Sequence, residues 1–98
     1  MARPRALVVE DSAEFARLSA RLLEAEGFEV TVAADGEAGV ELARSTTPEV
    51  VLLDISLPGW DGIEVCRRIR EFSDCYVIMV TGRTDEVDRV LGLTMGAD

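Results

Sequence analysis

Short apolar runs alternate along this chain with longer stretches in which apolar residues recur every three or four positions. The runs occupy residues 6–9, 28–33, 50–53 and 76–80. Runs of this length predict β-strands, and the stretches between them have the period of amphipathic helices. The helical periodicity is marked first by Phe15, Leu18, Leu22 and Leu23, then by Ala38, Leu42 and Ala43, then by Val65, Ile69 and Phe72, and finally by Val87, Val90 and Leu91. This alternation predicts βαβ units, and hence a three-layer α/β/α fold around a parallel sheet.

The four runs differ in the spacing of their apolar residues. Residues 28–33 alternate apolar and polar side chains, which is typical of a partly exposed edge strand. The other runs are continuously apolar, as in strands buried on both faces. Two of these can be central, and residues 76–80 would then form the opposite edge. Because an unpaired apolar edge promotes aggregation, we expect a further strand to cover it, from sequence beyond residue 98 or from a second molecule.

Residues that favour helix ends stand between these segments. The candidate N-terminal caps, whose side-chain oxygens can accept a backbone N–H, are Asp11 or Ser12, Asp35, Asp61 and Thr84. Gly27 and Gly96 stand where a helix would end and where positive φ is favoured. These signals agree with the alternation of strands and helices.

The composition indicates one small acidic domain. The chain has 98 residues, 48% of them hydrophobic, which is enough for a core and leaves no room for a second domain. Nineteen acidic residues against ten basic residues give a formal net charge of −9. This charge opposes binding of nucleic acid or of an anionic membrane by this domain.

The chain lacks the features of disulfide-rich, zinc-binding or exported proteins. Cys66 lies in a helical pattern and Cys75 just before a strand, which predicts two reduced, part-buried thiols. There is no histidine, and the two thiols do not have the spacing of a zinc finger. The apolar run before Glu10 is too short for a signal peptide or a spanning helix. We therefore expect a cytoplasmic protein.

Acidic and hydroxyl side chains follow three of the apolar runs, namely Glu10 and Asp11, then Asp54, then Thr81. Taken alone, Asp11 could cap a helix and Asp54 could form a turn. In an open parallel sheet, however, ligands bind beyond the carboxyl ends of the strands. Three carboxylates that converge there repel one another, and Mg²⁺, which prefers oxygen ligands, would relieve the repulsion.

Several segments resemble the receiver domain of response regulators in two-component signalling. Residues 7–11, Leu-Val-Val-Glu-Asp, resemble its first strand with an acidic pair. Residues 52–62, Leu-Leu-Asp-Ile-Ser-Leu-Pro-Gly-Trp-Asp-Gly, resemble the phosphorylation-site strand and its loop. Residues 77–82 resemble the fourth strand with its switch threonine, and residues 92–98 resemble the end of the fourth helix. The resemblance covers residues 5–98, with the segments in order and at family spacing.

The resemblance implies a flavodoxin-like open parallel sheet with strand order 2-1-3-4, and a signalling switch rather than an enzyme. Asp54 would accept a phosphoryl group from the phosphohistidine of a sensor histidine kinase, with Mg²⁺ as cofactor. Asp11, Asp54 and the backbone carbonyl of Ser56 would ligate Mg²⁺, while Glu10 would hold metal-bound waters. The Thr81 hydroxyl would bind the phosphoryl group and relay the change to a partner or output surface.

The chain departs from the family pattern in two respects. Trp60 stands where methionine is common, and all ten basic residues are arginine, so the family's lysine on a fifth strand has no counterpart. We therefore expect residues 1–98 to form a single receiver domain without its fifth strand and fifth helix, with any output domain, such as a winged helix, beyond residue 98. For the 98-residue chain we expect low stability and self-association, as a homodimer or a strand-exchanged pair through the fourth-strand edge.

Other functions fit the residues less well. A nucleotide or flavin site is disfavoured because the loop at residues 10–14 is acidic and would repel phosphate. A calcium loop counted from Asp54 would place Pro58 and Val65 at ligand positions, and a haloacid-type phosphatase would need an aspartate in place of Ser56. One alternative stays open: a receiver-like module that binds partners without phosphorylation.

Overall fold

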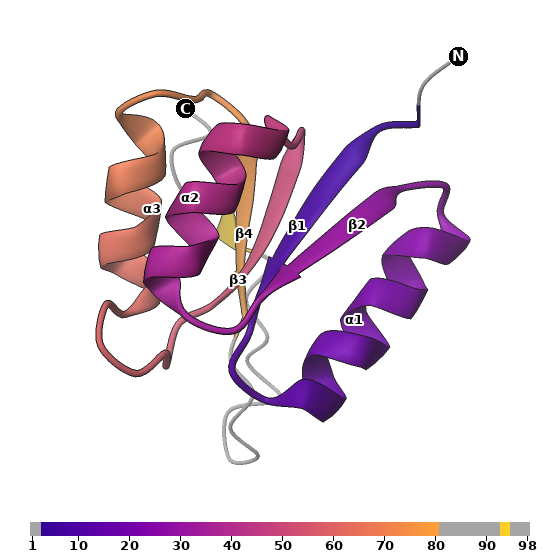
Figure 1. The fold of residues 1–98 in the computed structure, drawn as a ribbon, viewed down its shortest axis with the longest axis horizontal. Helices are drawn as coiled ribbons and strands as arrows, with labels where there is room; N and C mark the ends of the chain where they lie inside the picture. The colour runs from indigo at the N-terminus through magenta and orange to yellow at the C-terminus, as the bar shows by residue number, and fades with distance from the viewer. Residues whose placement is uncertain (1–2, 81–92, 95–98) are drawn as a thin grey trace.

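A sheet whose strands alternate with helices forms the centre of the computed structural model, which describes residues 3–80 and 93–94 (Figure 1). The strands are β1 (Arg5–Val9), β2 (Glu29–Ala33), β3 (Val50–Asp54), β4 (Tyr76–Val80) and the two-residue β5 (Leu93–Thr94). Their order in the sheet is β2-β1-β3-β4-β5. Strands β1 to β4 pair in parallel, which confirms the predicted parallel sheet with order 2-1-3-4.

Helices lie on both faces of this sheet. Helix α1 (Ala13–Ala25) covers one face, and α2 (Gly36–Thr46) and α3 (Gly62–Arg70) pack together on the other (Figure 1). Right-handed crossovers account for this arrangement, because the chain moves outward from β1 to β2 and then back across the sheet to β3 and β4. The three-layer prediction is thereby confirmed. In the described part of the chain, no helix has the length and apolar character needed to cross a membrane.

The helix starts follow the predicted capping chemistry. Ser12, rather than Asp11, caps α1, and its hydroxyl accepts a hydrogen bond from the Phe15 amide at 3.4 Å. Asp35 and Asp61 cap α2 and α3 in the same way, with acceptor distances of 2.8 and 3.0 Å. Because Ser12 supplies the cap, the side chain of Asp11 is left for another role. Gly27 follows α1 with φ of 99°, as expected, whereas Thr84 and Gly96 lie outside the described residues.

The main core lies between the sheet and the α2–α3 layer. Alternate residues of the central strands point into it and are fully buried, namely Leu7, Val9, Val51, Leu53, Val77 and Met79. They meet the apolar faces of the two helices, which contribute Val40, Ala43, Val65, Cys66 and Ile69. This core holds the carboxyl ends of β1 and β3 in fixed positions.

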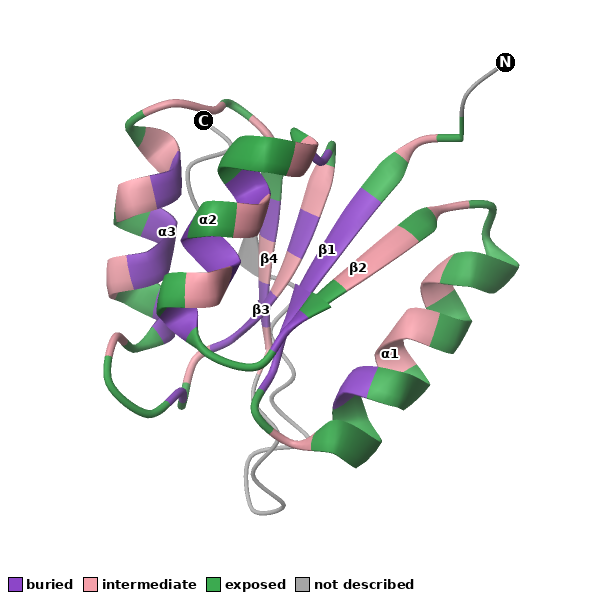
Figure 2. Ribbon diagram, viewed as in Figure 1, coloured by how far each residue is buried: buried purple, intermediate pink, exposed green. Residues whose placement is uncertain are grey.

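The opposite face of the sheet is less completely covered (Figure 2). Helix α1 contacts β1 and β2, so Leu52 of β3 and Ile78 of β4 are only half-buried. The prediction that β3 and β4 are buried on both faces is therefore wrong for these residues, although residues 6–9 of β1 are all buried. An apolar stripe on α1 is also exposed, with Phe15, Leu18 and Leu22 at 43%, 55% and 63%.

The outer edge of β4 is partly covered by the chain itself. Strand β5 pairs antiparallel with β4, with Thr94 opposite Ile78 and Leu93 opposite Met79. Two sequence predictions are corrected by this pairing. The β4 edge is not fully open, because free backbone groups on an apolar edge take a partner where one is within reach. Residues 93–94, expected at the end of a helix, are in a strand that runs against the direction of the other four.

We expect the two faces of the sheet to differ in how much stability is lost when a large side chain is shortened to alanine. Leu53 has 0% and Leu18 has 55% of its surface exposed. We expect Leu53→Ala to lower the free energy of unfolding by about 2–5 kcal/mol, because it leaves a cavity in the main core. Leu18→Ala should lower it by less than about 1 kcal/mol. Urea denaturation followed by circular dichroism measures both, and equal losses would contradict the assignment of the core.

Candidate functional site

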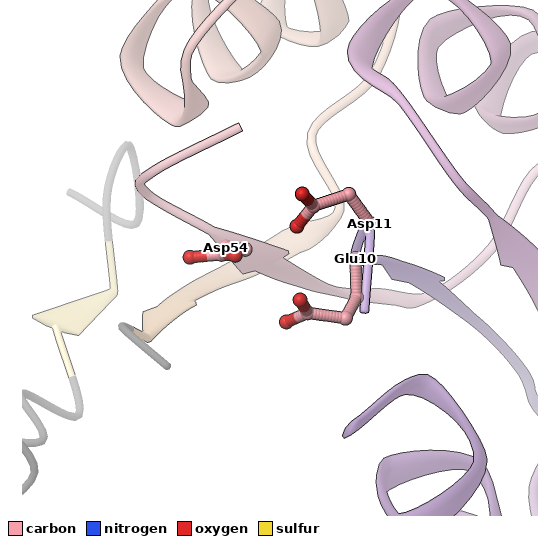
Figure 3. Close-up of side chains that lie close together, drawn as sticks. All are labelled: Glu10, Asp11 and Asp54. Atoms are coloured by element: carbon pink, nitrogen blue, oxygen red, sulfur yellow. The ribbon is translucent and has the colours of Figure 1, made fainter. Parts of the chain in front are cut away.

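Three carboxylates gather where β1 and β3 end. The two strands are adjacent and parallel, with Val9 in register with Leu53. Glu10 and Asp11 follow β1, and Asp54 is the last residue of β3, so the register brings all three to one edge of the sheet. Figure 3 shows the three side chains extending into the same space from the two strand ends. Their carboxylate oxygens lie within 4.8 Å of one another.

The three side chains differ in exposure. Only 4% of the surface of Asp54 and 8% of that of Glu10 is exposed to solvent. Among the described residues, these two are the buried polar or charged ones. Asp11 is exposed. The cluster is therefore buried at Glu10 and Asp54 and open to solvent at Asp11. A small ion or a phosphoryl group could enter from the side of Asp11.

Glu10 is held by the turn that follows β1. Its Oε2 accepts a hydrogen bond from the Ser12 amide at 3.0 Å, and its own amide donates to the Ala33 carbonyl of β2 at 2.9 Å. Burial raises the pKa of the Glu10 carboxyl to about 7. The Ser12 hydrogen bond opposes this increase in the pKa, and the negative charge of Asp54 adds to it. In the metal-free site, Glu10 therefore exchanges its proton near neutral pH.

Asp54 is held by the loop that follows β3. Its Oδ1 accepts a hydrogen bond from the Ser56 amide at 3.0 Å, which fixes the orientation of the carboxylate. The next residue is anchored on both sides, because the Ile55 amide donates to the Val80 carbonyl at 2.9 Å and the Ile55 carbonyl accepts from the Gly62 amide at 3.1 Å. The chain then turns at Gly59, whose φ is 75°.

The donor set fits a hard divalent cation. Carboxylate oxygens are the ligands that Mg²⁺ prefers, and a cation among three acids would offset their mutual repulsion. A proton on Glu10 is the alternative way to reduce the negative charge, and burial together with the charge of Asp54 raises the pKa of this carboxyl. The predicted roles of the Ser56 carbonyl and of each carboxylate stay predictions, and Thr81 lies outside the described residues.

Sequence reasoning missed two contacts near the site. The Ser12 amide supports Glu10, a hydrogen bond that side-chain patterns do not indicate. Trp60 is half-buried, and the Arg68 guanidinium lies 4.0 Å from its ring centroid. Because Trp60 lies in the loop before α3, no regular spacing in the sequence indicates this cation–π contact.

Two hollows of the described surface lie away from the carboxylates. One of about 480 Å³ lies along α2 and α3, and its lining includes Glu37, Arg44, Trp60 and Arg68. Another of about 390 Å³ lies on the other side of Trp60, beside Pro58 and Gly59.

Comparisons with known proteins agree with this geometry. The family profile described as response regulator receiver domain matches residues 6–98. The transcriptional regulatory protein BaeR of Escherichia coli O6:H1 is 43% identical over 95 residues, which cover 97% of this chain and 40% of that protein. The DNA-binding response regulator MtrA of Mycobacterium tuberculosis is 46% identical over 96 residues, which cover 98% of this chain and 42% of that protein. This chain thus spans about two-fifths of these curated relatives.

Solved structures show the same fold. A CheY-like response regulator receiver domain protein from Methanospirillum hungatei JF-1 matches with a TM-score of 0.79 and 30% identity, over 85% of this chain and 67% of that chain. The BeF3-activated N-terminal receiver domain of Klebsiella pneumoniae RstA matches with a TM-score of 0.75 and 31% identity, over 90% of this chain and 75% of that chain. Sequence, topology and the placement of the acidic cluster lead to one conclusion: this chain belongs to the response regulator receiver domain family of two-component signalling.

Proposed function

We propose that the chain acts as a phosphorylation-dependent switch in which Asp54 accepts a phosphoryl group from the phosphohistidine of a sensor histidine kinase. The observation that carries the proposal is the gathering of Glu10, Asp11 and Asp54 within 4.8 Å at the ends of two parallel strands. Asp54 is buried in this cluster, and the Ser56 amide orients its carboxylate. A carboxylate in this setting is suited to attack phosphorus.

In the proposed transfer, a carboxylate oxygen of Asp54 forms a bond to phosphorus while the bond from phosphorus to the histidine nitrogen breaks. The electron pair of that bond stays with the imidazole, which leaves as a neutral ring after taking up a proton. The product is an acyl phosphate on Asp54. The Ser56 amide holds Oδ1 of Asp54 during the attack, and this orientation lowers the entropic cost of reaching the transition state.

Mg²⁺ is the cofactor that we assign to the cluster. Asp11, Asp54 and the Ser56 carbonyl would ligate it, and Glu10 would hold its bound waters. When bound, the ion would neutralise the negative charge on the oxygens of the phosphoryl group during the transfer of that group. The exposed position of Asp11 leaves one side of the cluster open to the incoming phosphoryl group.

We assign the relay to Thr81, the residue that follows β4. Its hydroxyl would donate a hydrogen bond to the new phosphoryl group and draw its loop toward Asp54. Strand β4 is the neighbour of β3, and its last residue, Val80, lies opposite Asp54. A rearrangement of that loop would change the surface offered to a partner or output domain.

We infer a transcriptional role for the whole protein from its relatives, which include a transcriptional regulatory protein and DNA-binding response regulators. Because this domain has a formal net charge of −9 and would be repelled by DNA, we assign any contact with DNA to another domain. A cytoplasmic location and a sensor kinase as partner belong to the same proposal. The domain itself is a signalling module that promotes its own phosphorylation and slow dephosphorylation.

We also propose that the receiver domain continues beyond residue 98. The support is the apolar surface on the α1 side of the sheet, where Phe15, Leu18 and Leu22 are exposed and the β3 and β4 side chains are only half-buried. A further helix beside α1 would bury this surface, and an additional parallel strand would take the β4 edge that β5 partly covers here. A contiguous apolar face of this kind otherwise favours association.

The alternative function is a receiver-like module that binds partners without phosphorylation. The two functions differ in one measurable property, namely covalent phosphoryl uptake at Asp54.

Replacement of Asp54 tests the proposed function. We expect a small acyl phosphate with Mg²⁺ to add one phosphoryl group to a chain that includes the fifth strand, and Asp54→Asn to abolish this uptake because the amide is a poor nucleophile. Asp61→Asn is the matched control, since Asp61 is exposed and an asparagine still caps α3. Intact-protein mass spectrometry measures the added mass. Equal labelling of wild type and Asp54→Asn would sink the assignment, and an unlabelled wild type would favour the partner-binding alternative.

The affinity for Mg²⁺ should depend on pH through Glu10. With a pKa of about 7 in the metal-free chain, this carboxyl is mostly protonated below that pH, and the proton must leave when the cation enters. We expect the affinity to rise by about tenfold between pH 6 and pH 8. Glu10→Gln should flatten this rise. Calorimetric titration at the two pH values measures it, and an affinity that falls with pH would contradict the sign.

The exposed α1 stripe predicts self-association of the 98-residue chain. Sedimentation velocity should show a concentration-dependent mixture of monomer and dimer, and Leu18→Gln with Leu22→Gln should shift it toward monomer. Arg17→Gln with Arg21→Gln is the control, because these exposed residues lie on the same helix outside the stripe. A chain that is monomeric at all concentrations without the substitutions would contradict both the stripe and the β4 edge as association surfaces.

A further inference from the structure

The first residue of α3, Gly62, lies against the backbone at the end of β3. A Cβ atom added to Gly62 would lie 2.8 Å from the Asp54 carbonyl oxygen and 2.9 Å from the Ile55 Cα. Both distances are shorter than real Cβ contacts. Because the atoms that it would meet belong to the backbone, they cannot rotate away as the end of a side chain can.

The lack of room for a side chain, rather than a need for positive φ, explains the glycine at this position. Gly27 and Gly59 have positive φ, whereas Gly62 does not, so its backbone is open to any residue. Glycine is disfavoured within a helix because it loses more conformational freedom than alanine on folding. Its presence as the first residue of α3 is therefore accounted for by the close approach to Asp54 and Ile55.

Backbone hydrogen bonds connect this contact with the proposed phosphorylation site. The Gly62 amide donates to the Ile55 carbonyl at 3.1 Å, and the Ile55 amide donates to the Val80 carbonyl of β4 at 2.9 Å. Residue 55 is thereby held between α3 and β4. Its neighbours carry the acceptor carboxylate and the amide that orients it, since the Ser56 N–H donates to Asp54 Oδ1. A displacement of Ile55 would move both groups relative to Glu10 and Asp11.

We propose that Gly62 is a positioning residue for phosphoryl transfer: its lack of a side chain lets α3 press on the end of β3 and thereby sets the Asp54 carboxylate against Glu10 and Asp11. The inference rests on the proposed function of Asp54. Gly62 itself touches neither the metal nor the phosphoryl group in this proposal. It acts through the backbone of residues 54 to 56.

The chain contains a matched control for this position. Gly36 is the first residue of α2 and follows the cap Asp35, as Gly62 follows the cap Asp61. A Cβ atom on Gly36 would lie 2.6 Å from Cγ2 of Val65 and 3.1 Å from Cβ of Trp60. Gly36→Ala therefore also introduces steric strain at the start of a capped helix, but the strain falls on the contact of α2 with Val65 and Trp60.

The test compares Gly62→Ala and Gly36→Ala in the natural full-length protein. We expect Gly62→Ala to weaken Mg²⁺ binding by about tenfold, as loss of a residue that orients a ligand does, and to slow phosphorylation by a small acyl phosphate by about tenfold or more. Amide resonances of Ile55 and Ser56 should shift in nuclear magnetic resonance spectra. Gly36→Ala should keep Mg²⁺ affinity and the phosphorylation rate within about twofold of wild type.

Two results would overturn the inference. One is a folded Gly62→Ala protein with the Mg²⁺ affinity and phosphorylation rate of wild type, and the other is an equal loss of both in Gly36→Ala. If Gly62→Ala does not fold, Ile55→Gly tests the same contact from its other side. It loosens the backbone of a half-buried residue and should also weaken Mg²⁺ binding and slow phosphorylation; wild-type values would again overturn the inference.

Failure of the proposed function gives a different result. A wild-type protein that takes up neither Mg²⁺ nor a phosphoryl group contradicts the role of Asp54 before any variant is compared. The inference about Gly62 is decided by the difference between the variants and an active wild type. The amide shifts of Ile55 and Ser56 report separately whether Gly62 sets the end of β3.

Discussion

Repulsion among three carboxylates at the ends of β1 and β3 is the constraint on which the rest of the structure depends. At separations within 4.8 Å, two unit charges repel by roughly 3 kcal/mol or more at an effective dielectric constant of about 20. The parallel register of the two strands imposes this proximity. The cluster can lower its energy by binding a proton on Glu10, whose pKa is raised by burial and by the charge of Asp54, or by binding a cation. Competition between these two states is the chemical basis of a metal-dependent site.

The fold resists this repulsion through contacts that lie outside the cluster. A buried core beneath β1 and β3 holds their ends in register. The amides of Ser12 and Ser56 each donate to one carboxylate, and the close approach of Gly62 to Asp54 and Ile55 fixes the start of α3 against β3. The acidic side chains therefore cannot separate by a movement of the strands. Charge balance must come from a bound proton or a bound cation, and the proposed function uses the cation.

Local patterns in the sequence predicted the strands, the helices and the residues at the strand ends, because alternation, periodicity and capping act over a few neighbouring residues. They could not decide between Asp11 and Ser12 as the cap of α1, since both offer an oxygen acceptor at adjacent positions. The antiparallel pairing of Leu93 and Thr94 with β4 and the half-burial of Leu52 and Ile78 depend on contacts between segments distant in the chain. The burial of Glu10, and hence its raised pKa, has the same origin.

Chemical mapping of the phosphorylated residue tests the central claim most directly. An acyl phosphate is reduced by borohydride to an alcohol with release of phosphate, so a phosphorylated aspartate becomes homoserine. After phosphorylation of the natural protein by a small acyl phosphate with Mg²⁺, we predict homoserine at position 54 in the peptide mass spectrum, and only after treatment with both reagents. Homoserine at another aspartate, or none at all in a protein that has gained a phosphoryl group, would contradict the account.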